Sequence, residues 1–384
     1  MKIVVAGNIG QSLVNFRGPL LRSMVELGHD VVAVAPDGDT AYAQEVEALG
    51  VRYRTVPLQR AGVGLVADLR TLLGFWRLLG EERPDVFLGY TIKPVIYGNL
   101  AAQLRGVPVR SALITGLGYA FGERRGLQRT VGWLVDTLYR LALGRARVVF
   151  FQNPDDRAEF LRRGFVDEAR AALVAGSGVD LTRFVSSPPP PGPPVFLLIA
   201  RLIREKGIDQ YVAAARAIKA RHPEARFQLL GPLDQNPSAV APAEVEAWQR
   251  EEVVEYLGET SDVRPYLERA SVFVLPSYYR EGTPRTALEA LATGRPVVTT
   301  DAPGCRETVV DGVNGFLVEP RSAAALEAAL ERFVREPELI ARMGAASLEL
   351  ARTKYDVRLV NRAMLAHLGL DRRTVPALGS GSFT

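Results

Sequence analysis

Cysteine is nearly absent from this chain, with Cys305 as its single example in 384 residues. One cysteine excludes an intrachain disulfide and a cysteine-based zinc site. Long apolar runs are also missing, and because no stretch reaches about 20 apolar residues, we expect no segment to span a membrane. The opening MKIVVAG is typical of a strand and not of a cleavable signal peptide. We therefore expect a cytoplasmic protein.

Neither sign of charge is in large excess, because 47 Lys/Arg and 43 Asp/Glu give a net charge of +4. The basic surplus lies in residues 1–185, which hold 23 basic and 18 acidic residues, whereas the remainder holds 24 and 25. This distribution favours an anionic surface or substrate beside the first half. An ordinary arginine-rich, solvated surface explains the same count. The length suits about two domains.

Strand and helix signals alternate along the chain, which predicts an α/β fold with parallel sheets. The strands expected in the first half are 2–7, 30–36, 51–57, 85–90, 109–115 and 147–153. Those expected in the second half are 195–202, 226–232, 253–259, 271–276, 295–300 and 315–320. Two doubly wound domains facing a central cleft follow from this pattern.

The run SSPPPPGPP at 186–194 interrupts the alternation. Proline cannot complete helix or sheet hydrogen bonding, so we expect a semi-rigid linker between domains. The predicted domains are 1–185 and 195–352. A helix at 353–370 should then pack back on the first domain, ahead of a disordered tail at 371–384.

The loop after the first strand, GNIGQS, contains Gly7 and Gly10. A dinucleotide-binding fingerprint requires GxGxxG, so this GxxG supports NAD binding only weakly, despite Asp37 after the second strand. A tight strand-to-helix turn explains both glycines without any ligand. Both interpretations of the loop stay open at this point.

Two glutamates eight residues apart mark the most informative segment, LPSYYREGTPRTALEALATGRPVV. We expect a buried strand before it and a helix that begins at Pro284 with Thr283 as N-cap. Glu281 then lies in a loop at the carboxyl end of a parallel strand, where open α/β sheets bind ligands, and Glu289 lies on the second helical turn. Carboxylates accept hydrogen bonds from hydroxyls, whereas Arg285 and the helix N-terminus suit an anion. A sugar phosphate fits this chemistry.

Two cations follow another buried strand, in the segment IARLIREKG. Arg201 and Lys206 at a strand end are best explained by an anion that meets them, and a diphosphate neutralises both. The alternative is a solvated pair of strand-end cations. The glutamate segment after a neighbouring strand favours the diphosphate.

These segments together resemble retaining glycosyltransferases of family 4, over about residues 1–368. The second-half motifs are IARL-x3-KG (199–207), LLGPLDQNPSA (229–239), YLGETSDVRPYL (256–267), GSGVDLTRF (176–184) and the glutamate segment within 274–318. The first half adds TIKPVIYGNLAA (91–102), TGLGYAF (115–121) and FFQNPDDRAEF (150–160). These motifs resemble the branch that builds bacterial surface polysaccharides and lipid-linked oligosaccharides, such as the enzymes that add N-acetylgalactosamine to undecaprenyl-diphosphate-linked bacillosamine.

The resemblance implies a GT-B fold, with the acceptor bound by the first domain and a UDP-sugar donor bound mainly by the second. Arg201 and Lys206 would hold the diphosphate, Glu281 the transferred sugar and Glu289 the ribose. The other implied donor contacts are Gly10, Pro232, Leu233, Gly258, Val263, Gly282, Thr283, Pro284 and Arg285. The resemblance also implies front-face transfer with retention, in which the leaving diphosphate accepts the acceptor's proton. No cluster of aspartates indicates an essential metal, and we expect no cofactor.

The chain departs from the family pattern at one position. Many members carry a first-domain histidine near the donor sugar, whereas His29, His222 and His367 of this chain lie elsewhere and suit structural or exposed positions. The segment Tyr90–Lys93 occupies the corresponding strand end. Lys93 is therefore a candidate catalytic residue with an electrostatic role, and a structural lysine is the alternative.

A basic amphipathic segment at 121–147 suits the surface of an anionic membrane. Its candidate contacts are Arg124, Arg125, Arg129 and Trp133, and an earlier helix adds Arg70, Phe75, Trp76 and Arg77. The alternative is a helix whose apolar residues face the core and whose basic face is solvated.

The predicted function is transfer of a hexosamine from a UDP donor to a polyprenyl-diphosphate-linked saccharide, at the inner face of the cell membrane and without nucleic acid. One rival is a UDP-sugar epimerase or hydrolase on the same fold, for which no additional acid/base group stands out. A second rival is a non-catalytic binding subunit, which the presence of Arg201, Lys206 and Glu281 disfavours. A glycosidase needs carboxylates with separated pKa values, whereas flanking cations here favour two ionised acceptors.

Overall fold

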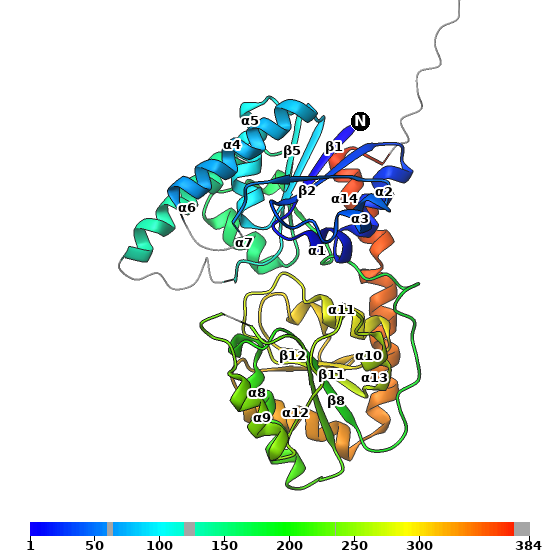
Figure 1. Ribbon diagram of the computed structural model, residues 1–384. Helices are drawn as coiled ribbons and strands as arrows, with labels where there is room; N and C mark the ends of the chain where they lie inside the picture. The colour runs from blue at the N-terminus through cyan, green and yellow to red at the C-terminus, as the bar shows by residue number, and fades with distance from the viewer. Residues whose placement is uncertain (60–63, 119–126, 235, 372–384) are drawn as a thin grey trace, which may run out of the picture. The chain divides into compact units, whose positions relative to one another are not determined.

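The computed structural model describes residues 1–59, 64–118, 127–234 and 236–371. These residues form two compact units (Figure 1). The first unit comprises the described residues of Met1–Thr115, Glu123–Val174 and Val360–Thr384, and the second those of Gly116–Gly122 and Ala175–Leu359. Each unit contains one parallel sheet.

Seven strands form the sheet of the first unit, in the order β3-β2-β1-β4-β5-β6-β7. They are β1 (Lys2–Ala6), β2 (Asp30–Pro36), β3 (Arg52–Val56), β4 (Val86–Tyr90), β5 (Val109–Ile114), β6 (Val148–Phe151) and β7 (Ala171–Leu173). The sequence did not predict β7, because three residues at a sheet edge carry too little pattern. The central strands are buried along nearly their whole length, as parallel sheets covered on both faces require.

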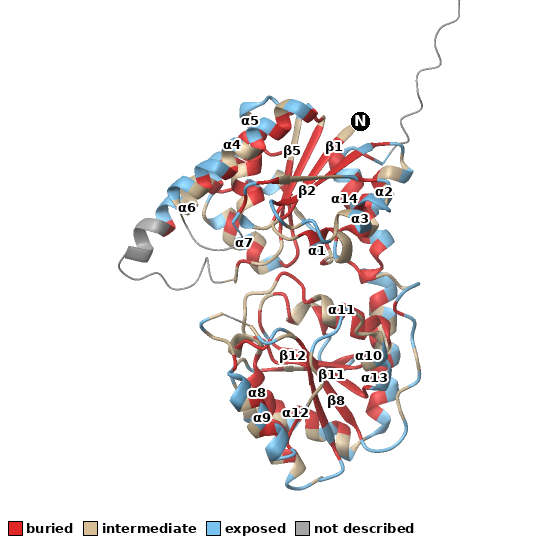
Figure 2. Cartoon of the chain, in the orientation of Figure 1, coloured by how far each residue is buried: buried red, intermediate tan, exposed pale blue. Residues whose placement is uncertain are grey.

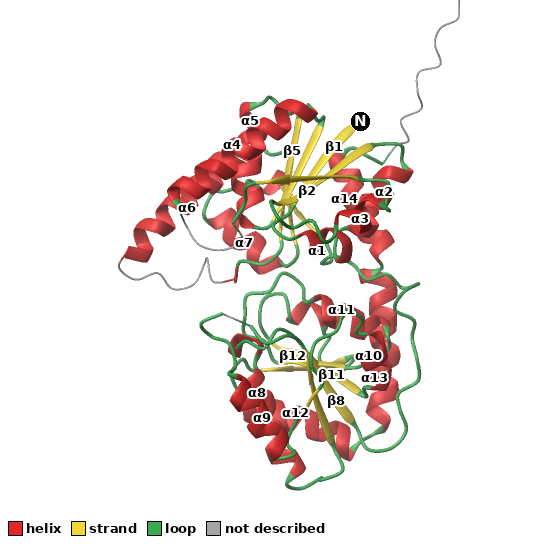
Figure 3. Cartoon of the chain, in the orientation of Figure 1, coloured by secondary structure: helices red, strands yellow, loops and turns green. Residues whose placement is uncertain are grey.

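Helices cover the two faces of this sheet (Figure 3). They are α1 (Gly10–Asn15), α2 (Gly18–Glu26), α3 (Ala43–Glu47), α4 (Leu65–Glu82), α5 (Asn99–Leu104), α6 (Leu127–Leu143), α7 (Pro154–Arg162) and α14 (Val357–Leu368), with a π turn at Pro94–Gly98 before α5. The long helix α4 packs Phe75, Leu78 and Leu79 into the core beside β4. Phe75 meets Phe87 edge to face, with ring centroids 6.1 Å apart.

Six strands form the sheet of the second unit, in the order β10-β9-β8-β11-β12-β13. They are β8 (Val195–Ile199), β9 (Arg226–Leu230), β10 (Glu255–Tyr256), β11 (Val272–Leu275), β12 (Val297–Thr300) and β13 (Gly315–Val318). The helices are α8 (Ile208–Lys219), α9 (Pro242–Arg250), α10 (Arg264–Arg269), α11 (Arg285–Ala292), α12 (Ala323–Arg335) and α13 (Glu338–Leu350).

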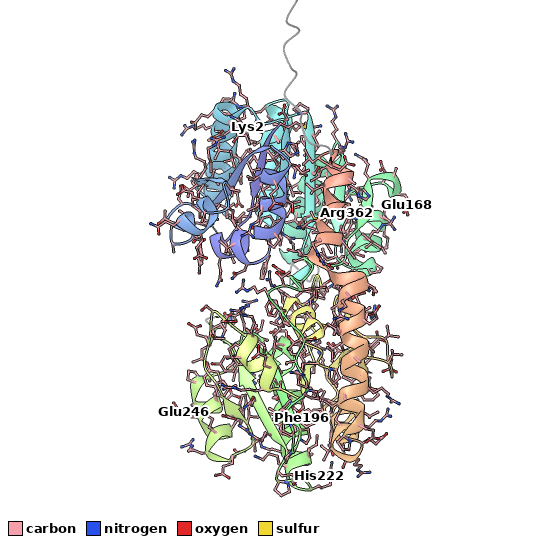
Figure 4. The ribbon with its side chains drawn as sticks, turned by 90° about the vertical axis from the view of Figure 1, so that its right-hand side faces the viewer. Lys2, Glu168, Phe196, His222, Glu246 and Arg362 are labelled. Atoms are coloured by element: carbon pink, nitrogen blue, oxygen red, sulfur yellow. The ribbon has the colours of Figure 1, made fainter. Side chains whose placement is uncertain are left out.

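Buried residues line both faces of the sheet of the second unit (Figure 2). Their side chains are mainly aromatic and aliphatic. Phe196 of β8 lies among the strands (Figure 4) and stacks on Phe227 of β9, with ring centroids 4.9 Å apart. The runs VFLLI in β8 and VFVL in β11 are buried throughout. These apolar runs explain why the sequence predicted both strands correctly.

The unit boundaries differ from the predicted domain boundaries. The chain passes into the second unit after Val174, not after residue 185, because Val179 and Phe184 belong to the second core. The proline-rich segment 186–194, predicted to be an interdomain linker, therefore lies inside the second unit. The chain returns to the first unit at Val360, within α14. Apart from Asp371, the predicted tail lies outside the described residues.

A buried arginine holds the proline-rich segment in place. Arg295 is fully buried, and its guanidinium donates hydrogen bonds to the carbonyls of Ser187 and Pro188 and to the Ser187 hydroxyl. It also donates to the carbonyls of Leu267 and Glu268 in α10. Burial lowers the pKa of Arg295 to about 10, which leaves the group charged at neutral pH. One side chain thus ties three parts of the second unit together.

We expect Arg295→Met to lower the free energy of unfolding by at least about 2 kcal/mol, because it leaves buried carbonyl oxygens without donors. Urea unfolding followed by circular dichroism measures the change. The matched control is Arg342→Met, at an exposed arginine of α13. If the urea midpoint of Arg295→Met equalled that of this control, the hydrogen bonds of the Arg295 guanidinium would add no net stability.

Candidate functional site

Charged side chains gather where the strand order of the second sheet reverses, between β8 and β11. Arg201 follows β8, and Lys206 ends the 3₁₀ turn Arg204–Lys206. Glu281 lies in the loop after β11, and Glu289 lies on α11. The structure therefore places all four predicted residues in one unit, at the kind of switch point where open α/β sheets bind ligands.

Lys206 and Glu281 form an ion pair at the centre of this group. The Ser277 hydroxyl donates to the same Glu281 oxygen at 3.0 Å. Both charged side chains are only 13% exposed, so the pair is weakly screened by solvent. The Nζ atom of Lys206 also lies 5.5 Å from the ring centroid of Tyr279. A diphosphate that binds Lys206 must therefore compete with Glu281.

Gly207 brings the two strand ends into contact. Its φ of 78° lies in the left-handed region, and a Cβ there would lie 2.1 Å from the carbonyl oxygen of Pro276 at the end of β11. Only glycine permits this approach. The turn that carries Lys206 is thus held directly against the loop that carries Glu281.

Arg201 is half exposed and forms an ion pair with Asp234 at 2.9 Å. The amide of Leu202 donates to the carbonyl oxygen of Pro232 at 3.0 Å, and Leu202 and Leu233 form an isolated parallel bridge. The predicted residues Pro232 and Leu233 therefore lie beside Arg201. The sequence had not indicated Asp234, because a pair 33 residues apart leaves no local pattern.

Glu289 is buried on α11, with its Oε1 atom 2.7 Å from Nε of Arg285. Burial raises the pKa of Glu289, and the charge of Arg285 opposes the rise. The helix begins at Arg285, with Pro284 as N-cap in an extended conformation. The prediction of a helix start at Pro284 with Thr283 as N-cap was therefore wrong by one residue.

Glycines from two other loops enclose the backbone at Glu281–Gly282. A Cβ on Gly116 would lie 2.5 Å from the amide nitrogen of Gly282, and one on Gly304 would lie 2.4 Å from its carbonyl oxygen. The Gly118 amide donates to the Arg280 carbonyl at 3.2 Å. The sequence analysis did not predict that Gly116 and Gly304 would position this backbone. Glycines in loops that follow strands often mark such close backbone contacts and could have indicated them.

The remaining predicted donor contacts lie at the ends of β9 and β10. The Gly231 amide donates to the carbonyl of Gly258 at 2.8 Å, and Tyr256 donates to the carbonyl of Gly231 at 3.0 Å. Gly258 has a φ of 75° and open space around its Cα. Val263 is the N-cap of α10 and packs on the core. These residues therefore lie at the same edge of the sheet as Pro232 and Leu233, beside Arg201.

Comparison with known proteins assigns both halves of the chain. The description "Glycosyl transferase 4-like domain" matches residues 17–176, and "Glycosyl transferases group 1" matches residues 181–349. The colanic acid biosynthesis glycosyltransferase WcaL of Salmonella typhimurium is 30% identical over 357 residues, which cover 82% of this chain and 86% of that one. This chain is a family 4 glycosyltransferase with the GT-B fold.

Two further comparisons extend this result to nearly the full length of the glycosyltransferase. An N,N'-diacetylbacillosaminyl-diphospho-undecaprenol alpha-1,3-N-acetylgalactosaminyltransferase of Campylobacter jejuni is 26% identical, over 95% of this chain and 97% of that one. The Anabaena protein HepE, solved in complex with UDP and glucose, matches with a TM-score of 0.73 at 18% identity, over 96% of this chain and 99% of that one. The latter likeness shows the fold.

The two glycines of the loop after the first strand belong to the first unit of the glycosyltransferase. The Gly10 amide, predicted to face the donor, donates to Oδ2 of Asp39 at 2.6 Å. Gly7 lies under Tyr90, where a Cβ would lie 2.2 Å from the ring. Both glycines thus make close contacts within the first unit.

Lys93 of the glycosyltransferase is neutralised by an aspartate that the sequence did not indicate. Its Nζ atom lies 2.8 Å from Oδ1 of Asp68 on α4, and both side chains are nearly buried. Thr91, two residues earlier, has a φ of 66°, which is rare for threonine and turns the chain sharply after β4. This geometry favours a structural lysine.

Each histidine of the glycosyltransferase has a partner within its own unit, and none of these partners belongs to the charged group. His29 is buried beside the carbonyl of Leu370, and burial lowers its pKa. His222 lies at the far end of its sheet, near Glu331 (Figure 4). His367 lies edge to face with Phe150.

The predicted membrane contacts are only partly described. Trp133 on α6 is 66% exposed, whereas Arg124, Arg125 and the side chain of Arg129 lie outside the described residues. Phe75 is fully buried, so its predicted part in a membrane surface was wrong. Among the described helices, none is long and apolar enough to cross a bilayer. The described residues also include no group of three or more His, Cys, Asp or Glu that could hold a metal.

We expect Glu289→Gln to stabilise the glycosyltransferase at pH 7.5 while it weakens UDP binding. A carboxyl whose pKa is raised by folding loses stabilising free energy as the pH rises through that pKa, and a glutamine avoids this loss. The increase in the free energy of unfolding that Glu289→Gln produces should therefore shrink as the pH falls toward 4.5, the ordinary pKa of glutamate. Urea unfolding at several pH values and UDP titration measure the two effects.

The control is Glu244→Gln. Its hydrogen bonds with Arg204 lower the pKa of Glu244, so this substitution should destabilise the fold at pH 7.5. If Glu289→Gln destabilised the fold at pH 7.5, as is expected of Glu244→Gln, the burial argument for Glu289 would be wrong.

Proposed function

We propose that this glycosyltransferase moves a sugar, with retention, from a UDP-sugar to a polyprenyl-diphosphate-linked saccharide in the synthesis of surface polysaccharide or glycan. The observation that carries the proposal is the group formed by Arg201, Lys206, Glu281 and Glu289 where β8 and β11 meet. Cations for a diphosphate and acceptors for hydroxyls lie together there. A sugar nucleotide has both kinds of group.

Arg201 and Lys206 are assigned to the diphosphate, because both lie at the strand ends that face the switch point. When the diphosphate binds Lys206, it competes with Glu281 for the ammonium, and the Glu281 carboxylate then accepts hydrogen bonds from sugar hydroxyls. Glu289, buried behind the start of α11, is assigned to the ribose. Leu233, 44% exposed beside Arg201, offers an apolar surface to the base.

In the proposed reaction, the bond between the sugar's C1 and the diphosphate oxygen breaks as the acceptor oxygen bonds to C1 on the same face. The departing diphosphate takes the acceptor's proton. Lys206 and Arg201 stabilise the charge that grows on the diphosphate, an effect of preorganised charge. These cations also support the proposal that no metal ion or other cofactor is needed.

The acceptor is proposed from the relatives. The Campylobacter relative is named for transfer of N-acetylgalactosamine to a diphospho-undecaprenol saccharide in alpha linkage. An N-acetylhexosamine and a lipid-diphosphate acceptor are therefore the first substrates to test. Such an acceptor would place the enzyme at the inner face of the cell membrane as a peripheral protein.

Arg201→Ala and Lys206→Ala should each lower kcat by about 10²–10³-fold, since a lost transition-state contact of this kind costs about 3–4 kcal/mol. Both should also weaken UDP binding in calorimetry. Arg216→Ala is the control, because Arg216 is a half-exposed arginine of α8 paired with Glu251. Unchanged turnover and UDP affinity in both site variants would refute the diphosphate assignment.

A screen of UDP-sugars against undecaprenyl-diphosphate saccharides tests the function directly. Mass spectrometry should show the acceptor gaining one N-acetylhexosamine, and NMR should show the donor's anomeric configuration kept. We expect EDTA to leave the rate unchanged. An inverted product would refute front-face transfer, and free sugar or an isomerised donor would favour the hydrolase or epimerase.

A further inference from the structure

Helix α4 exposes apolar side chains on its outward face. The opposite face carries Phe75, Leu78 and Leu79 into the core. Leu65 is 85% exposed, the highest value among the large apolar residues. The outward apolar residues recur at helical spacing and are Leu65, Val66, Leu69, Leu73 and Trp76. A solvated helix normally presents polar residues there, so this stripe needs a partner.

Two arginines border the stripe. Arg70 and Arg77 lie two turns apart on α4, both exposed, and neither forms an ion pair within the described residues. Together with Leu73 they line a pocket of about 410 Å³ between α4 and β3. A third lining arginine, Arg54, is already paired with Glu81 and Glu82. The pocket is therefore lined by two arginines that form no ion pair within the described residues. Its acidic lining residues are Glu81, which pairs with Arg54, and Asp37.

We infer that the α4 surface binds an anionic lipid bilayer, with a lipid phosphate in the pocket between Arg70 and Arg77 and the apolar stripe among the acyl chains. The inference rests on the proposed lipid-linked acceptor, which only a membrane-bound enzyme reaches. Arg105 supports it, because its guanidinium lies 3.4 Å from the ring centroid of Trp76 and adds a cation beside the stripe. A second copy of this chain is disfavoured, because it would bring the same arginines together.

Sedimentation of the full chain with vesicles tests this surface. An arginine near an anionic bilayer contributes about fivefold to partitioning, so Arg70→Ala with Arg77→Ala should weaken binding to phosphatidylglycerol vesicles by about 25-fold. Leu69→Ser with Leu73→Ser should also weaken vesicle binding. High salt should lower the vesicle binding of this variant less than it lowers that of the parent protein. Circular dichroism checks that each variant folds. The lysine pair, Arg70→Lys with Arg77→Lys, keeps the charge and should bind nearly as the parent protein does.

The matched control is Arg342→Ala with Arg352→Ala, which removes the same charge from exposed positions of the second unit. The inference is overturned if the α4 and control pairs bind vesicles equally. It is also overturned if binding of inorganic phosphate depends on Arg70 and Arg77 while the Leu69→Ser, Leu73→Ser variant binds vesicles as the parent protein does. A dimer that forms through the apolar stripe would overturn it as well.

Turnover with a short-chain, water-soluble acceptor should be unchanged in the α4 variants. A protein that binds vesicles through α4 but transfers no sugar would refute the proposed function and leave the membrane surface standing.

Discussion

The ion pair between Lys206 and Glu281 joins the two strand ends on which the charged group of the second unit is built. Lys206 is carried there by the turn at Gly207, and Glu281 by the loop after β11. Because both side chains are nearly buried, loss of either leaves an uncompensated charge. Each residue therefore positions the other before any ligand arrives, and the geometry of the group depends on both.

A consequence of this pairing is selectivity for the ligand. Arg201 and Arg285 also have carboxylate partners, Asp234 and Glu289. An anion alone gains little in a group whose charges are already balanced. A ligand that offers phosphates to the cations and hydroxyls to the released carboxylates replaces both halves of each pair. Under the proposed function, balanced ion pairs therefore favour a sugar nucleotide over free phosphate.

The sequence predicted features that have a local signature. Continuous apolar runs revealed both sheets, and the strand-end motifs revealed Arg201, Lys206, Glu281 and Glu289. Features that depend on distant residues were missed or wrong. Arg295 joins the proline-rich segment to α10 through hydrogen bonds to Ser187 and Glu268. No local sequence pattern predicts contacts between residues so far apart in the chain.

The difference between local patterns and contacts with distant residues also applies to the predicted site residues of the first unit. Its switch point carries Gly10 and Lys93, two residues predicted for the site, yet each meets a carboxylate from its own unit: Asp39 for the Gly10 amide and Asp68 for the Lys93 ammonium. A motif conveys which residue follows a strand but not which distant side chain satisfies it. Under the proposed function, the donor chemistry is therefore assigned to the second unit. The arginines and the exposed apolar face of α4 are then the first unit's proposed contribution to reaching a lipid-linked acceptor.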